Sequence, residues 1–121
     1  MWLAALWACT ALTGLETLEQ LPDDFPLAIE GEIGVITSPQ GSEQVAVDVA
    51  FPSPARARQG WIDLRAQAES KGFVVAHEGH HDKREVITLE APAGRLELGC
   101  CRPRADRKQL VFVTWWPTGT P

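Results

Sequence analysis

Two prolines divide this chain of 121 residues into unlike parts. Pro22 and Pro26 fix their own φ angles and disfavour helix in the residues that precede them. The segment before Pro22 is apolar, and its first charged residue is Glu16. The segment after Pro26 carries patterns typical of several strands and one helix. We therefore predict an apolar leader or N-terminal helix over residues 1–21 and a single domain over residues 22–121.

The pattern after Pro26 predicts an α+β domain. Ser53 and Pro54 suit a helix N-cap and first helical position, and Gly72 suits a left-handed helix end. A helix is therefore expected from residue 54 to about residue 71. The expected strands span residues 33–37, 43–51, 73–77, 86–90, 95–101 and 110–116. The order β-β-α-β-β-β-β predicts a mostly antiparallel sheet with one helix packed on a face.

The apolar periodicities also predict the core. Trp61, Leu64 and Ala68 recur at helical spacing, while Val47 and Val49 alternate along a strand. We expect these two sets to pack against each other. The last strand is apolar on both faces, which is typical of a central position in a sheet.

Three short motifs resemble a group of small uncharacterised bacterial secreted proteins and lipoproteins. They are the P-D-D-F-P sequence at Pro22–Pro26, the helix pair Trp61–Ile62 and the helix exit Gly72–Phe73. Ile62 departs from the second aromatic residue of that helix pair. The resemblance spans about residues 22 to 116. It implies the fold predicted above and a place in the bacterial cell envelope, without implying an activity.

The first fifteen residues carry no charge and have the length of the apolar part of an export signal. They are too few to cross a bilayer, which takes about 20 apolar residues. Leu6-Trp7-Ala8-Cys9 resembles a lipobox, so Cys9 is a candidate site of lipid attachment. Trp7 is larger than the residue usual there, and few residues precede Cys9.

Two other interpretations of this segment stay open. Ordinary secretion to the periplasm is one, although a signal peptide normally starts with a cation and this chain has none near Met1. An upstream start codon would supply it. The other is a folded helix of a cytoplasmic protein, because Thr13 and Glu16 have the spacing of a capping box.

The charge distribution limits the classes of partner. The net charge is −5, and every Lys and Arg lies at or after Arg56. We expect an acidic N-terminal region and a mildly basic C-terminal part. An acidic total argues against nucleic acid, because phosphate binding needs a cationic surface. Membrane contact is expected only through the leader or a lipid anchor, which leaves a protein as the partner class.

One cluster has the residue types of a metal site. His77, His80 and His81 are followed by Asp82, and imidazole and carboxylate groups bind zinc, nickel or copper. A turn expected around Gly79 would bring His77 and His81 toward each other. The alternative is a solvated polar turn, since the cluster lacks the helical H-E-x-x-H pattern. No cofactor is predicted.

Two further segments are candidates for contact with a partner. Neighbours in a strand point to opposite faces, so one of Trp115 and Trp116 should enter the core while the other covers the second face or stays exposed. The alternative is that both pack against the chain's own helix or N-terminal segment. Residues 102–108 form a cationic loop that could dock an acidic partner or anionic headgroups, or simply be solvated.

No motif predicts catalysis. The sequence has no G-x-S-x-G elbow, no phosphate-binding loop and no G-x-G-x-x-G. Cys100 and Cys101 are expected as free thiols, because a bond between neighbours forms a strained ring and neighbouring side chains in a regular strand point to opposite faces. We therefore predict a non-catalytic envelope module, periplasmic or lipid-anchored, with a binding or structural role. A metal-binding module and a cytoplasmic interaction subunit are the alternatives.

Overall fold

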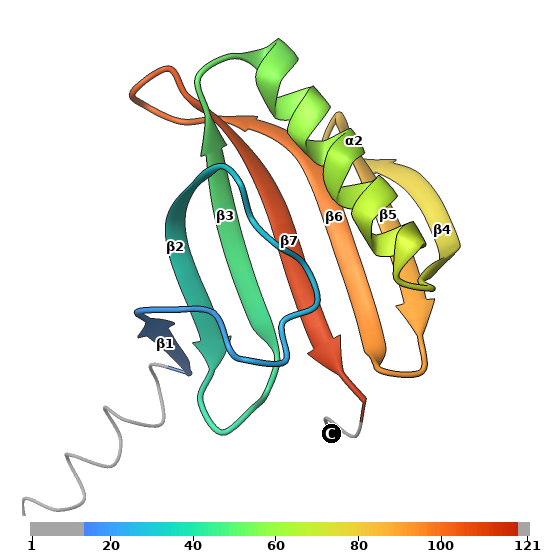
Figure 1. Cartoon of the computed structure of the whole chain (residues 1–121). Helices are drawn as coiled ribbons and strands as arrows, with labels where there is room; N and C mark the ends of the chain where they lie inside the picture. Colours follow the sequence, from blue (N-terminus) through green and yellow to red (C-terminus); the bar gives the residue numbers. More distant parts are fainter. Residues whose placement is uncertain (1–13, 119–121) are drawn as a thin grey trace, which may run out of the picture.

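The computed structural model describes residues 14–118. They form a seven-stranded antiparallel sheet in the order β1-β2-β3-β7-β6-β5-β4, with helix α2 across one side (Figure 1). The elements are β1 (Leu15–Leu18), β2 (Glu32–Pro39), β3 (Val45–Phe51), α2 (Pro54–Ser70), β4 (Val74–His81), β5 (Arg84–Ala91), β6 (Gly94–Pro103) and β7 (Gln109–Pro117). The predicted α+β class and the order β-β-α-β-β-β-β are confirmed from β2 onward, and β1 precedes them.

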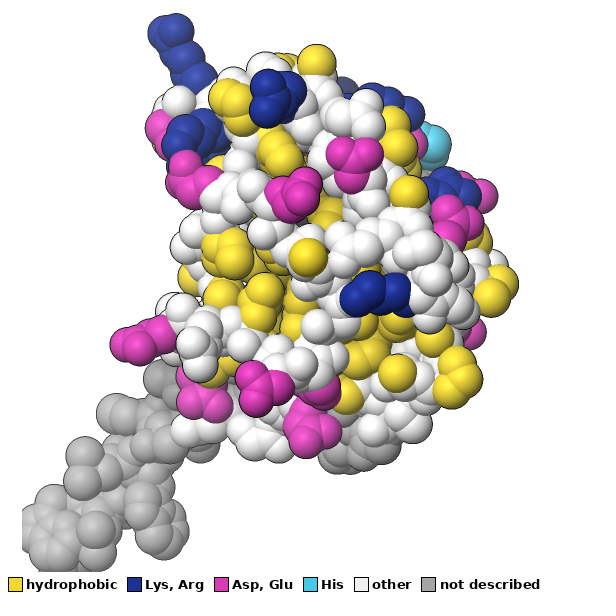
Figure 2. All heavy atoms as spheres, viewed as in Figure 1, with side chains coloured by type: hydrophobic (Ala, Val, Ile, Leu, Met, Phe, Trp, Pro, Cys, Tyr) yellow, Lys and Arg dark blue, Asp and Glu magenta, His cyan; other side chains and the backbone are white. Residues whose placement is uncertain are grey.

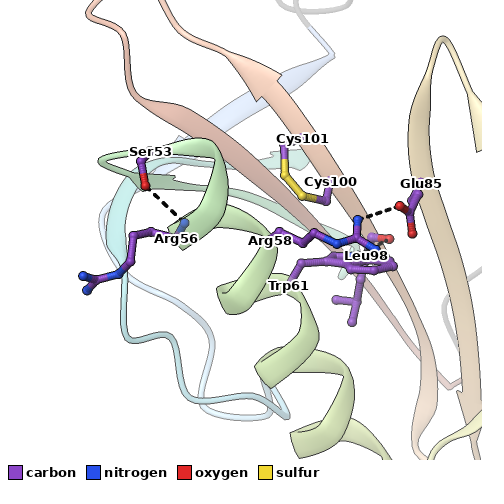
Figure 3. Close-up of a disulfide and its surroundings, with 8 residues drawn as sticks. All are labelled: Ser53, Arg56, Arg58, Trp61, Glu85, Leu98, Cys100 and Cys101. Carbon is purple, nitrogen blue, oxygen red and sulfur yellow. Dashed lines mark hydrogen bonds and ion pairs between the residues drawn. A yellow bond between two sulfur atoms is a disulfide. The ribbon is translucent and has the colours of Figure 1, made fainter.

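Helix α2 begins and ends where its local signals indicate. The Ser53 side chain accepts a hydrogen bond of 3.2 Å from the backbone N–H of Arg56, and Pro54 is the first helical residue (Figure 3). Gly72 follows the helix with a φ of +94°, in the left-handed region that favours glycine. The predicted helix and its caps are confirmed.

The core lies between the sheet and α2. Trp61, Leu64 and Ala68 are buried, and the Trp61 indole N–H donates to the backbone carbonyl of Leu98 at 3.1 Å. The strand residues on the same side are also buried: Val45, Val47, Val49, Ile87, Leu89, Leu96, Leu98, Val111 and Val113. The predicted packing is confirmed, and β7 lies between β3 and β6 as its apolar faces indicate.

Strand β7 joins two parts of the chain that are distant in sequence. It pairs with β3 over seven residues, from Val45 opposite Trp115 to Phe51 opposite Gln109. On its other side it pairs with β6, the neighbouring strand in the chain. The segment between β1 and β2 crosses the same side of the sheet as α2 (Figure 1). It buries Leu27 against the core.

Strand β1 was not expected. Leu15–Leu18 pairs antiparallel with Ile36–Pro39 of β2, so the helix that was one alternative for this part of the chain is wrong from residue 14 onward. The pairing gives backbone groups of both strands their partners, and Leu18 also packs against the core. These non-local contacts outweigh the local helix signal. The sheet thus reaches into the segment predicted as leader, whose first thirteen residues lie outside the described part.

The predicted turn around Gly79 is also wrong. Strand β4 continues to His81, and the hairpin turn is Asp82–Lys83, with φ angles of +51° and +68°. Positive φ at both central residues is the geometry of a type I′ hairpin turn, which matches the twist of the strands. Gly79 instead lies in the middle of β4, opposite Val86. Within residues 14–118, no helix has the length and apolar character needed to cross a membrane.

Candidate functional site

The two sides of the sheet are covered differently. Helix α2 and the segment between β1 and β2 both lie on one side, shown toward the viewer in Figure 1. We call the other side the open face. Strand alternation and register place on it, among others, Asp48, Arg84, Arg95, Arg102, Phe112 and Trp116.

The two adjacent tryptophans separate onto the two sides. Trp115 is 2% exposed and packs edge to face with Phe73, with 6.0 Å between ring centroids. Trp115 is therefore too buried to contact a partner. Of the two predicted interface residues, only Trp116 is accessible. Trp116 is half-buried on the open face, and the Arg95 guanidinium lies 4.3 Å from its ring centroid.

Two more arginines lie over a second aromatic residue of the open face, Phe112. The guanidinium carbons of Arg102 and Arg84 lie 4.6 Å and 5.7 Å from the ring centroid of Phe112. Gly99 is opposite Phe112 on β6 and has no side chain to shield the ring from that direction. The open face therefore combines two half-buried rings with three guanidinium groups that lie over them at cation–π distance.

These arginines differ from those on the helix side in their partners. On the helix side, Arg58 pairs with Glu85 at 2.6 Å and Arg65 pairs with Glu78 at 3.0 Å. Within residues 14–118, no carboxylate hydrogen-bonds or ion-pairs with the three open-face arginines. Stacking uses the flat face of a guanidinium and leaves its N–H donors at the rim. The open face is thus equipped to receive hydrogen-bond acceptors, carboxylates above all.

Three carboxylates share the open face with these arginines. Glu90 lies opposite Arg95 on β5, and Glu97 lies on β6 between Arg95 and Gly99. The third is Asp48. It lies opposite Phe112 on β3 and is half-buried. Burial raises the pKa of its carboxyl group, and the positive charge of Arg102 offsets part of that effect. Its negative charge is therefore disfavoured by its own surroundings. It makes no ion pair with Arg102 in the described structure.

The cationic loop is largely neutralised within the chain. Arg104 pairs with Asp106 and Glu32, and Lys108 also pairs with Glu32. Lys108 and then Arg104 hold the pKa of Glu32 below its ordinary value, while Arg104 chiefly lowers the pKa of Asp106. The loop is therefore attached to β2, while its first residue, Arg102, lies over the Phe112 ring. Its docking role stays a prediction.

The helix side carries a groove of about 450 Å³ between α2 and residues 28–32. Figure 2 shows apolar side chains exposed in a hollow on this side. Val49 and Leu64 line the groove, and charged side chains of both signs stand along it, namely Glu30, Glu32, Arg56, Asp63 and Lys108. Its volume falls within the range of small-molecule sites. The mixed charges do not select one class of ligand.

The walls of the groove are fixed by close contacts. A Cβ at Gly31 would lie 3.0 Å from the Phe51 ring, and a Cβ at Gly60 would overlap the same ring. The ring therefore sits between a glycine of the loop and a glycine of the helix. Further along, the Gln67 side chain makes two hydrogen bonds to the backbone of Ala28, at 2.6 and 3.1 Å.

The three histidines are exposed along β4. His77 and His81 point to the open face, while His80 points to the helix side with Glu78. Within the described residues, 14–118, no group of three or more His, Cys, Asp or Glu side chains is placed to hold a metal ion. A turn at Gly79 would have brought these histidines together. Because β4 continues to His81, they are spread along a strand instead.

The cysteines depart from the sequence expectation where the structure describes them. Cys100 and Cys101 are joined by a disulfide, beside the helix-side pair of Arg58 and Glu85 (Figure 3). The expectation of free thiols assumed a regular strand. Pairing of β6 with β7 instead shifts register between Cys100 and Arg102. The candidate lipid attachment site Cys9 lies outside the described residues.

Comparison of the chain with protein-family models, curated proteins and solved structures finds no match. The resemblance over residues 22 to 116 accordingly stays a prediction.

Sequence reasoning identified Trp116, named Arg102 only as part of the cationic loop 102–108, and missed Phe112, Arg84 and Arg95. Phe112 could have been found, because it shares the two-residue period of Trp116 along the last strand. The three arginines carry no such signal, because they belong to two other strands and their placement depends on register. Their stacking on the rings is a product of the fold.

Proposed function

We propose that this chain is a non-catalytic binding module of the bacterial envelope, and that its open face binds an acidic segment of a protein partner. The observation that carries the proposal is the set of three arginines stacked on Phe112 and Trp116 without carboxylate partners among residues 14–118.

Stacked arginines favour binding for two physical reasons. A guanidinium held against a ring has lost part of its side-chain freedom before the partner arrives, which lowers the entropy cost of binding. Its planar donors also match a carboxylate in a two-bond geometry. The rings add apolar contact area beside the charges, as aromatic residues do at interfaces.

The choice of a protein over a nucleic acid follows from the charges of the whole chain. A net charge of −5 repels a polyphosphate backbone at long range. A short acidic segment needs only the local field of the three arginines. Asp48 lies on the same face, where burial raises the pKa of its carboxyl group and the positive charge of Arg102 lowers it.

Three sequence features support the envelope location. They are the apolar first fifteen residues, the lipobox-like sequence that ends at Cys9, and the resemblance of residues 22 to 116 to secreted proteins and lipoproteins.

The test is a titration of the full chain with an octaglutamate peptide at low salt. Tryptophan fluorescence or calorimetry measures the binding. Arg102→Gln combined with Arg95→Gln should weaken binding at least tenfold. The matched control combines Arg56→Gln with Arg107→Gln, two exposed arginines that stack on neither ring and change the net charge equally. The control should bind like the unaltered chain.

Two outcomes would contradict the proposal. One is an unaltered chain that does not bind octaglutamate. The other is equal weakening in both double variants, because that would reduce the effect to net charge. Octalysine serves as a probe of opposite sign and should not bind the open face.

A further inference from the structure

Strand β4 is an unpaired edge. It is the last strand in the sheet order, so its outer backbone N–H and C=O groups have no strand beside them in the described structure. From His77 to His81 it pairs with β5 without interruption, after a register shift that follows Val75. Such a regular edge is a template for another strand.

The sequence of this edge is complementary to itself about Gly79. If a second β4 pairs antiparallel with Gly79 opposite Gly79, Glu78 lies opposite His80 on the helix side. An imidazole N–H can donate to that carboxylate, and this happens twice because the arrangement is two-fold. On the open face, the same register sets His77 opposite His81. If the two-fold axis passed through Glu78 instead, Glu78 would lie opposite Glu78. If it passed through His80, His80 would lie opposite His80.

One half of a metal site already exists in each chain. The Nε2 atom of His81 lies 3.4 Å from the Oδ2 atom of Asp82. Ligand atoms about 2.1 Å from a tetrahedral zinc lie roughly 3.4 Å apart. His81 and Asp82 can therefore bind one zinc ion together with little rearrangement.

His77 of the same chain is poorly placed to complete that site. Four residues along an extended strand separate Cα atoms by about 13 Å. This separation is consistent with the lack of a three-ligand group among residues 14–118. Across the two-fold pairing, however, His77 of the second copy is a direct neighbour of His81, with Cβ atoms about 5 Å apart.

We infer that two copies of this chain pair through β4 and bind zinc between them. His81 and Asp82 of one copy and His77 of the other hold each ion, with water completing the coordination, as three-ligand zinc sites allow. The two-fold symmetry gives two equivalent sites for each dimer. The inference goes beyond the proposed function and does not depend on it. Neither site exists without the second copy, so zinc stabilises the dimer by mass action.

Sedimentation velocity of the full chain with zinc chloride, with magnesium chloride or with a chelator tests the inference. Zinc should convert single chains into dimers at one zinc per chain, and magnesium should not. His77→Ala and His81→Ala should each abolish this conversion. The control Glu16→Ala changes an exposed side chain on β1, at the opposite edge of the sheet, and should keep it. Circular dichroism verifies that each variant is folded.

The decisive experiment mixes His77→Ala chains with His81→Ala chains. A mixed dimer has one intact site, because one chain supplies His77 and the other supplies His81 and Asp82. Zinc should therefore restore dimers in the mixture that neither variant forms alone. Failure of the mixture to form dimers overturns the inference. So does zinc-linked dimerisation that survives His77→Ala, or an unaltered chain that stays single with zinc.

Discussion

The two sides of the sheet are built from the same strands and are covered differently. On the helix side, β3, β6 and β7 present aliphatic side chains such as Val49, Leu98 and Val113, all fully buried. On the open face the same strands present Asp48, Arg102 and Phe112, which remain partly or largely exposed. The difference shows that burial depends on what covers a face, since alternation sends neighbours in sequence to opposite environments.

Arginine has a different role on each side. The helix-side arginines pair with Glu85 and Glu78 of the outer strands, which ties α2 to the far part of the sheet. The open-face arginines stack on rings and keep their donors unpaired by carboxylates in the described part of the chain. The helix-side charges thus connect elements of the fold, whereas the open-face charges have no carboxylate partner among residues 14–118.

The largest effect is expected from truncation on the helix side. Trp61→Ala should lower the free energy of unfolding by about 3–5 kcal/mol, as removal of a buried aromatic side chain does. The indole also donates to Leu98, so Trp61→Phe should lose only the hydrogen bond and some packing, about 1–2 kcal/mol. Urea unfolding measures both. If Trp61→Ala left the free energy of unfolding unchanged, Trp61 would not be part of the core.

A smaller loss is expected where the helix side is packed most tightly. Gly60→Ala should lower the free energy of unfolding by about 1–3 kcal/mol, because its Cβ would overlap the Phe51 ring. In an open helix the same change would gain about 1 kcal/mol. The control Gly99→Ala places a Cβ 3.7 Å from Phe112, an ordinary contact, and should change stability less. Thermal unfolding of the two variants shows whether Gly60→Ala lowers stability, as expected here, or raises it, as in an open helix.

The open face should respond mainly in binding. Trp116→Ala removes a half-buried ring and should cost about 1 kcal/mol of unfolding free energy. It should abolish octaglutamate binding at concentrations that saturate the unaltered chain, since Arg95 loses the ring that holds it. A loss of stability as large as that of Trp61→Ala would show that the open face is covered.

The smallest effect concerns Asp48. Its pKa is raised in the folded state, so folding takes up protons at this group and its ionisation opposes folding. Stability should therefore fall as pH rises through the raised pKa. Asp48→Asn should unfold at higher urea concentration than the unaltered chain at pH 7. The advantage should shrink toward pH 3, where both side chains are neutral, and an opposite trend would contradict the assigned cause.

Local chemistry explains which elements could be predicted from the sequence. The cap at Ser53 and the end at Gly72 act within a few residues, so the bounds of α2 were predicted closely. Strand β1 depends on pairing with residues about twenty positions later, which no local pattern reveals. The β4–β5 turn was misplaced because Gly79 is the residue type usual in turns, whereas Asp82 and Lys83 adopt positive φ without glycine.

The candidate site was predictable only in part for the same reason. Alternation indicated that one of Trp115 and Trp116 would face outward, and Trp116 does. The partners of Trp116 come from register, since Arg95 lies opposite it only when β6 and β7 pair as observed. Register depends on the whole sheet, so the arginine stacking could not be read from the order of residues.

The pairing of β3 with β7 has a consequence for how the chain folds. Strands β4 to β7 follow one another as hairpins, each closing a short loop, whereas β3 meets β7 only after a loop of roughly sixty residues has closed. Local hairpins form in microseconds, and non-local pairing of this kind slows folding. The chain is therefore two local units, residues 14–51 and residues 54–118, joined by the pairing of β3 with β7 and by contacts of α2 with the first unit. Two separate polypeptides with those bounds should assemble through the same contacts when mixed.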